Sequence, residues 1–226
     1  MAEQPTPLAR NLLRRALPES ILRAIRVFRE LDPASRAALP RVWFRRWFSR
    51  EPELPPLPPS PRLLFVCRGN ILRSAMAEAV FQQVARGGNG TARYAVTSAG
   101  TAAAEGNPAD PRGQKVAQEL GLDLSSHRAR PLTAAAVEEA DLILVMDYLN
   151  EAEVLGHFPS AAPKVRLLAT FGANHSRPRE IQDPYSGSEE DVRTAFDAIS
   201  AAVRRLVATI GLVPSPPSSN SHTGAP

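Results

Sequence analysis

A strand–loop–helix segment in the first third of the chain constrains the fold more than any other feature. Residues 63–66 form a short apolar run typical of a buried strand, and residues 75–84 have the composition of a helix. The loop between them begins with the chain's single cysteine, Cys67, and ends with Arg73 and Ser74. Inward-pointing loop amides and the positive end of a helix dipole bind anions. The segment therefore predicts an anion site with a thiol at its start and a guanidinium at its end.

The spacing from Cys67 to Arg73 suits the transfer of a phosphoryl group. A free thiol with a pKa of about 8.5 is mostly protonated at neutral pH, and amides, a helix dipole and an arginine would favour the reactive thiolate. The same groups would hold the phosphoryl oxygens, because the planar guanidinium of Arg73 can bind two of them at once. Ser74 can donate a hydrogen bond to the sulfur. The alternative interpretation of Cys67 is a buried thiol of the core.

Two residues inside the loop favour the backbone shape that such a site needs. Gly69 and Asn70 both suit left-handed backbone, which we expect where the loop turns its amides inward. The segment lacks the glycine and lysine pattern of nucleotide P-loops, so a nucleotide site of that kind is not predicted.

Strands and helices alternate along the chain after residue 61. Gly121 is expected to end one helix and Ser188 to cap the last one. Such alternation predicts an α/β fold, a doubly wound four-stranded parallel sheet with helices on both faces. Ligands of these sheets bind beyond the carboxyl ends of the strands, which is where Cys67 lies. The predicted strands are 63–66, 94–98, 141–146 and 164–168, and the predicted helices are 75–84, 110–120, 133–139, a stretch after Asp147, and 188–210.

The positive charge of the chain is concentrated in its N-terminal quarter. Residues 1–51 contain eleven arginines and five acidic residues, a net charge of +6, whereas residues 52–226 contain sixteen basic and eighteen acidic residues, a net charge of −2. We therefore expect no nucleic-acid partner for the larger part. The single cysteine excludes an intramolecular disulfide, and no apolar run approaches the ~18 residues of a membrane span. With no secretory signal in residues 1–20, these features favour the cytoplasm.

Residues 1–51 form a predicted basic, helical N-terminal extension. Residues 8–31 are expected to contain one or two helices, and Pro40 is expected to break the next stretch. An aromatic helix face with arginines beside it favours contact with an anionic membrane surface or a partner protein. Packing against the rest of the chain, or disorder, is the alternative. Four aromatic residues would share that face: Trp43, Phe44, Trp47 and Phe48.

Composition divides the rest of the chain into three parts. Residues 52–61 are rich in proline and predict an extended linker, either a semi-rigid spacer or a ligand for an SH3-type groove. Residues 62–212 form the predicted folded domain. Residues 213–226 contain almost no apolar side chains and predict a disordered tail.

Five motifs occur in an order that resembles one known family. The sequence VCRGNILRSAMAE, at residues 66–78, is similar to the signature of the low-molecular-weight protein tyrosine phosphatase family. The resemblance implies that phosphotyrosine of a protein substrate is hydrolysed through a phosphocysteine intermediate, without a metal or other cofactor. The later motifs are SAGT at 98–101, NPADPR at 107–112, SHRARPL at 126–132 and DPY at 183–185.

The resemblance assigns roles to single residues, with Cys67 as nucleophile and Arg73 as phosphate clamp. Expulsion of a phenolate, whose conjugate acid has a pKa of about 10, needs a proton donor, and Asp183 is the candidate acid and base. A simple Asp-Pro turn is the alternative. Ser98 and Asn70 match residues that brace the loop, and His127 matches a structural hydrogen bond. The implied phosphate- and substrate-binding residues are Arg68, Gly69, Asn70, Ile71, Leu72, Ser74 and Tyr185, with Arg68 facing outward and Tyr185 forming a pocket wall.

Three features depart from the family pattern. Many relatives carry a second cysteine where Leu72 stands, so this chain lacks the partner for a protective disulfide. Relatives often place an aromatic residue near the position of Ala104, so the pocket is expected to be less walled. The N-terminal extension is the third departure, and as an appendage its removal is expected to leave catalysis nearly intact.

Alternative functions stay open at this point. Related arginine phosphatases carry threonine where Ile71 stands, so Ile71 favours phosphotyrosine. Arsenate reductases of the same fold use additional cysteines, so this chain would need an external thiol for that reaction. A catalytically weak phosphate-binding scaffold protein, targeted by its basic extension, is the remaining alternative.

Overall fold

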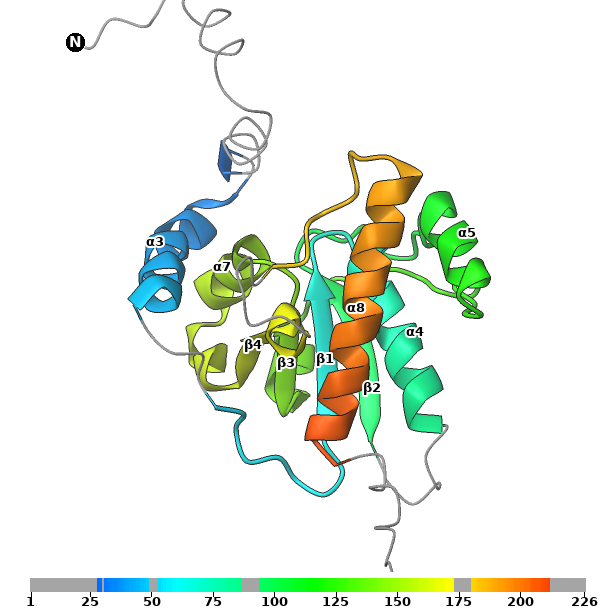
Figure 1. Cartoon of the computed structure of the whole chain (residues 1–226). Coiled ribbons are helices and arrows are strands. Elements are labelled where there is room, and N and C mark those ends of the chain that lie inside the picture. The colour runs from blue at the N-terminus through cyan, green and yellow to red at the C-terminus, as the bar shows by residue number, and fades with distance from the viewer. Residues whose placement is uncertain (1–27, 30, 49–52, 87–93, 173–179, 212–226) are drawn as a thin grey trace, which may run out of the picture.

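A computed structural model of the chain describes residues 28–29, 31–48, 53–86, 94–172 and 180–211 (Figure 1). Most of the helical stretch predicted within 8–31 and the whole of the predicted tail at 213–226 lie outside these residues. Within them, short parallel strands form a single sheet that is flanked by helices.

The sheet has four parallel strands in the order β2-β1-β3-β4, which confirms the predicted doubly wound architecture. The chain passes from β1 to its neighbour β2 and then crosses to β3 on the other side of β1. The order of the strands therefore reverses between β1 and β3, and both strands end at this switch point. The strands are β1 (Arg62–Cys67), β2 (Ala95–Gly100), β3 (Leu142–Val145) and β4 (Val165–Leu167).

Alternate residues of β1 pack into two separate cores. Leu63, Phe65 and Cys67 face α4 (Arg73–Arg86) and α8 (Glu189–Thr209), together with a contribution from α5 (Pro111–Glu119). Leu64 and Val66 face the opposite side, where α6 (Ala134–Glu139) and α7 (Tyr148–His157) cover the sheet. This period of two is the geometry of an extended strand buried on both faces. Short 3-10 helices, η1 (Pro159–Lys164) and η2 (Leu168–Phe171), flank β4.

Side chains cap the helices where the sequence indicates. Ser188 accepts from the amide of Asp191, and the Asp191 carboxylate accepts from the Ser188 amide, so α8 begins with a capping box. Asp147 caps α7 by accepting from the amide of Asn150. Gly121 takes a φ of 73° just after α5, the left-handed conformation expected for a helix end.

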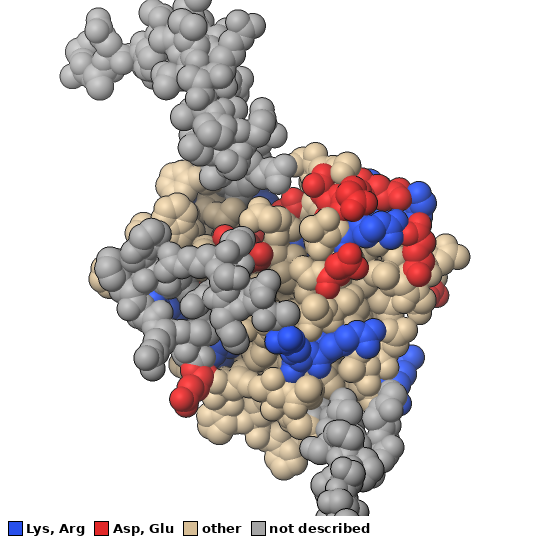
Figure 2. Space-filling model, viewed as in Figure 1, with Lys and Arg blue, Asp and Glu red and all other residues tan. Residues whose placement is uncertain are grey.

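Charged side chains of both signs crowd over the start of α8 and the neighbouring α5 (Figure 2). Lys115 of α5 pairs with Glu189 of α8 at 2.8 Å, and Arg193 of α8 pairs with Glu119 of α5 at 2.5 Å. These pairs are exposed, and exposed pairs contribute little to stability individually. They connect α5 with α8 near the end of the sheet where β1 and β3 finish.

The N-terminal extension contributes helix α3 (Pro33–Phe48), which packs along α7 (Figure 1). Leu31, Leu39 and Val42 bury their side chains with Ala152 of α7. The prediction that Pro40 breaks the helix is wrong, because α3 continues through it. An interior proline costs about 3 kcal/mol through a lost hydrogen bond and a clash, and burial of the α3 apolar side chains on α7 offsets that cost.

The proline-rich stretch lies against the domain in its described part, residues 53–61. Leu54 and Leu57 pack against the core between the sheet and α8. The guanidinium of Arg166 in β4 donates to the carbonyl of Glu53. The stretch therefore lies on the surface of the domain and leads from α3 into β1. In the described part of the chain, none of the helices is long and apolar enough to span a membrane.

Gly100, the last residue of β2, lies where the loop after β1 crosses over the sheet. A Cβ at Gly100 would lie 2.6 Å from the carbonyl oxygen of Arg68 and 2.9 Å from the amide nitrogen of Asn70. Both distances are shorter than carbon can approach backbone atoms. The strand end therefore has to be glycine for the loop to take its observed path.

Gly100→Ala is expected to destabilise the protein by about 1–3 kcal/mol, because backbone and not a flexible side chain would have to move. Thermal unfolding of the variant measures the effect. Gly69→Ala is the matched control, since a Cβ there meets only the flexible side chain of Ile71, at 3.4 Å from Cγ1 and 3.8 Å from Cδ1. Equal melting temperatures for the two alanine variants would contradict the proposed crowding at Gly100.

Candidate active site

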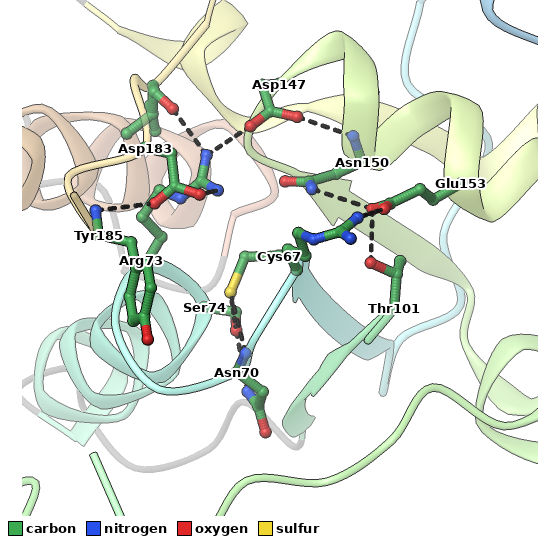
Figure 3. Close-up of polar contacts among 12 residues, drawn as sticks. Cys67, Asn70, Arg73, Ser74, Thr101, Asp147, Asn150, Glu153, Asp183 and Tyr185 are labelled. Carbon is green, nitrogen blue, oxygen red and sulfur yellow. Dashed lines mark hydrogen bonds and ion pairs between the residues drawn. The ribbon is translucent and has the colours of Figure 1, made fainter. Parts of the chain in front are cut away.

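The candidate site lies at the switch point of the sheet, beyond the carboxyl ends of β1 and β3. Cys67 ends β1, and Asp147 follows β3 and caps α7. Figure 3 shows Cys67 and Arg73, from the two ends of one loop, beside Asp183, which comes from a much later part of the sequence. The topology of the chain brings Asp183 to the loop.

The sulfur of Cys67 lies within the loop and receives polar contacts. The Asn70 amide donates to Sγ at 3.3 Å, and the Oγ of Ser74 lies 3.0 Å from Sγ. The Ser74 hydroxyl also accepts from the side-chain amide of Asn70 at 2.9 Å, and it lies 3.5 Å from the carbonyl of Ala99, to which it can donate. The sulfur therefore has polar neighbours from the loop and from the start of α4. Cys67 is thus not simply a core thiol, although its side chain is buried.

Asn70 is the centre of the network that shapes the loop. Its backbone has a φ of 54°, as predicted, and its Nδ2 also donates to Ser98 Oγ at 2.9 Å. Its Oδ1 accepts from the amide of Arg130 at 2.8 Å, and its carbonyl lies 2.6 Å from His127 Nε2, which must be the donor. Every polar group of the Asn70 side chain is therefore used. Ser98 and His127 thus each form a hydrogen bond with Asn70.

Other residues of the loop contribute through their backbone or through packing. Gly69 does not take the left-handed conformation, so that prediction is wrong, and Asn70 alone supplies the positive φ of the loop. The side chain of Leu72 is buried in the core. It packs closely on Gly113 of α5, since a Cβ added to that glycine would lie 2.7 Å from Leu72 Cδ2. Ile71 is partly exposed, and its carbonyl accepts from the amide of Asp110. The two residues can therefore serve an anion only through backbone amides.

Arg73 begins α4 and is only 2% exposed. Its Nη1 donates to Asp147 at 2.5 Å and to the carbonyl of Ile181 at 3.0 Å, and its Nη2 pairs with Asp183 at 2.8 Å. Burial on its own would lower the pKa of Arg73, but the charges of Asp147, Asp183 and Cys67 outweigh it and raise that pKa. Arg73 is therefore a permanent, rigidly held cation beside the sulfur.

Asp183 and Tyr185 lie on the opposite rim from the loop. The carboxyl of Asp183 is partly exposed, and one oxygen also accepts from the amide of Tyr185 at 3.1 Å. Tyr185 is exposed, and Arg112 holds its carbonyl at 3.0 Å. Ala104 is exposed, and its methyl group adds no aromatic side chain there.

Arg68 does not point simply into solvent, because it forms an ion pair with Glu153 of α7. Glu153 also accepts from Thr101 Oγ1 at 2.5 Å and from Asn150 Nδ2 at 3.4 Å. Burial raises the pKa of Glu153, although the Thr101 hydrogen bond and the Arg68 charge oppose that shift. The pair ties the start of the loop to α7.

Two residues of the site were missed by the analysis of the sequence. Asp147 orients Arg73, and its position after a buried strand at the switch point is a signal that could have found it. Glu78 accepts from Ser98 at 2.5 Å and from Arg130 at 3.0 Å, and it completes the network behind Asn70. Glu78 lies one helical turn after Ser74, which by itself indicates no function. Among the described residues, no group of three His, Cys, Asp or Glu side chains is arranged to hold a metal ion.

Comparisons with known proteins agree with this geometry. A probable low molecular weight protein-tyrosine-phosphatase, EpsP of Ralstonia nicotianae, is 36% identical over 148 residues, which are 66% of this chain and 94% of that protein. The structure of a protein tyrosine phosphatase from Entamoeba histolytica matches with a TM-score of 0.61 and 34% identity, over 67% of this chain and 97% of that one. The YwlE arginine phosphatase of Geobacillus stearothermophilus matches with a TM-score of 0.59 and 31% identity, over 66% and 92%.

The family match covers the whole sheet and every residue of the site described above. Residues 62–212 match the family described as low molecular weight phosphotyrosine protein phosphatase. They include the loop from Cys67 to Ser74, the residues that brace it, and Asp183. Helix α3 lies outside the match. The chain therefore belongs to the low molecular weight phosphotyrosine protein phosphatase family.

Proposed function

We propose that this protein is a protein tyrosine phosphatase, a hydrolase that acts through a phosphocysteine intermediate. The observation that carries the proposal is the meeting of three groups at one loop: the sulfur of Cys67, the guanidinium of Arg73 and the carboxyl of Asp183. A nucleophile, a fixed cation and an acid are the groups that phosphoryl transfer from an aryl ester requires.

In the proposed reaction, Arg73 and the loop amides bind the phosphoryl oxygens. The phosphate takes the place of Asp183 on Nη2 of Arg73, while Nη1 stays on Asp147. Cys67 Sγ forms a bond to phosphorus as the bond from phosphorus to the phenolic oxygen breaks, and protonated Asp183 gives its proton to that oxygen. Asp183 then takes a proton from water, which attacks phosphorus, breaks the bond to sulfur and releases inorganic phosphate.

Phosphotyrosine is the proposed substrate in preference to phosphoarginine. The relatives include both tyrosine phosphatases and an arginine phosphatase, at similar identity, so the comparisons alone leave the choice open. Ile71 stands where the arginine phosphatases that this chain resembles carry threonine, and this residue favours phosphotyrosine. Arsenate reduction with an external thiol, or phosphate binding without turnover, are the alternatives.

Turnover of phosphopeptides distinguishes these functions. We expect release of phosphate from phosphotyrosine peptides at a kcat/KM at least about 10²-fold above that for phosphoserine or phosphoarginine peptides, since the acid is placed for a phenolic leaving group. Cys67→Ser is the control, because it removes the nucleophile and should abolish turnover while phosphate still binds. Preference for phosphoarginine, release of arsenite in the presence of glutathione, or binding without turnover would each favour another function.

The role of Asp183 as acid has its own test. Asp183→Asn is expected to slow hydrolysis of phenyl phosphate by about 10²-fold or more, and hydrolysis of nitrophenyl phosphate much less. The reason is that the nitrophenolate leaves readily without a proton. The measurement is kcat/KM across a series of aryl phosphates. If the variant lost the same factor for every leaving group, Asp183 would not be the acid.

We further propose that the protein acts in the cytoplasm at an anionic membrane surface. Helix α3 packs on α7 through Leu39 and Val42, and this leaves Trp43 and Phe44 60% and 67% exposed. The side chain of Arg41 is also exposed, and residues 1–51 carry a net charge of +6. Exposed aromatic rings beside arginines fit a membrane interface of negative charge.

Sedimentation with lipid vesicles tests this location. The protein is expected to bind vesicles that contain phosphatidylglycerol, to bind less at high salt, and not to bind vesicles of phosphatidylcholine alone. Replacing Trp43 and Phe44 by alanine should abolish binding, whereas Leu120→Ala, which alters an exposed leucine beyond α5, should not. No difference between the two variants, or binding to a protein partner only, would argue against the membrane.

A further inference from the structure

The start of α7 gathers buried carboxylates around the candidate active site. Burial raises the pKa of Glu180, and the charges of Asp147 and Glu151 raise it further, whereas its hydrogen bond from the Tyr148 amide opposes the shift. The positive end of the α7 dipole favours these acids, but buried carboxylates also need cations. Three arginines pair with three of them, two from the loop after β1 and one from α3: Arg73 with Asp147, Arg68 with Glu153, and Arg45 with Glu151.

Arg45 differs from the other two arginines because it lies in α3, outside residues 62–212. Its partner Glu151 is 0% exposed, so the carboxylate has little water to solvate its charge. Glu151 lies one turn after Asp147 on α7, and its amide donates to the Asp147 carbonyl at 3.1 Å. Arg45 of the extension therefore pairs with the first turn of α7. The cap of that same turn, Asp147, pairs with Arg73.

The position of α3 against α7 is closely defined. A Cβ at Gly156 of α7 would lie 2.7 Å from the Ser35 amide nitrogen and 2.8 Å from the Ala34 carbonyl carbon. Asp32 accepts from the Ser35 amide at 3.1 Å at the start of α3, and lies 3.0 Å from Nε2 of His157. The backbone of α3 contacts α7 at Gly156, and the ion pair of Arg45 with Glu151 joins the two helices nearer the other end. These contacts together define one position of α3 on α7.

We infer that α3 is part of the catalytic unit and that Arg45 is a positioning residue. By neutralising Glu151, Arg45 keeps the first turn of α7 in place, and with it the Asp147 carboxylate that orients Arg73. The inference rests on the proposed function for the role of Arg73. It changes the expectation that the extension can be removed without effect on catalysis.

Phosphate affinity is the direct measure of this coupling, because loss of the positive charge of Arg45 beside the buried Glu151 disfavours a second anion nearby. In the full-length protein, Arg45→Met is expected to weaken the binding of inorganic phosphate, followed by calorimetry, by about five- to tenfold. The same factor should appear in kcat/KM for an aryl phosphate. Arg45→Lys should keep most of the affinity, because it retains the charge. Arg41→Met, which removes an exposed arginine from the same helix, should match the wild type.

A double variant separates positioning from mere support of the fold. Arg45→Met combined with Glu151→Gln removes both charges and is expected to restore phosphate affinity toward the wild-type value. Should Arg45→Met fail to fold, the double variant and Arg45→Lys still make the comparison. The inference is wrong if Arg45→Met lowers only the melting temperature and leaves phosphate affinity unchanged. Because phosphate binding needs no turnover, that result is distinct from a failure of the proposed phosphatase activity.

Discussion

The burial of one guanidinium organises the rest of the structure. Arg73 has almost no contact with solvent, so its charge must be compensated by neighbours, and Asp147 and Asp183 approach it from the end of β3 and from the last loop. A parallel sheet brings those segments to one edge, where α4 begins after the loop that follows β1. In the proposed reaction, this fixed cation faces a phosphate with little reorganisation.

Two further sets of polar contacts surround Arg73 and its carboxylate partners. Behind the loop, Asn70 shares its amide between Ser74 and Ser98, and Glu78 receives the hydroxyl of Ser98. Beside it, the start of α7 holds carboxylates that pair with arginines from the loop and from α3. Removing one partner of a buried ion pair is costly, because the remaining charge stays out of water. In the inference drawn above, this is how a helix outside the family match influences the phosphate site, through the ion pair of Arg45 with Glu151.

Local patterns predicted some features well and failed at others for identifiable reasons. The strands around Cys67, the cap at Ser188 and the left-handed Asn70 follow from short-range rules and agree with the structure. Gly69 failed because a glycine permits a positive φ without requiring it. Pro40 failed because packing on α7 outweighed a local helix breaker. Asp147 was missed because an acid after a strand acquires its role only from the arginine that another segment places beside it.

The sequence by itself determined the alternating α/β architecture, the loop from Cys67 to Ser74 and the separate, basic character of the N-terminal extension. These depend on periodicity, turn residues and charge, which act over a few neighbouring residues. Only the tertiary structure decided that Asp147 and Asp183 share Arg73, that Arg68 is held by Glu153, and that α3 lends Arg45 to the buried Glu151. Charges separated by tens of residues interact strongly only after folding has excluded water from between them, and no local pattern records which ones will meet.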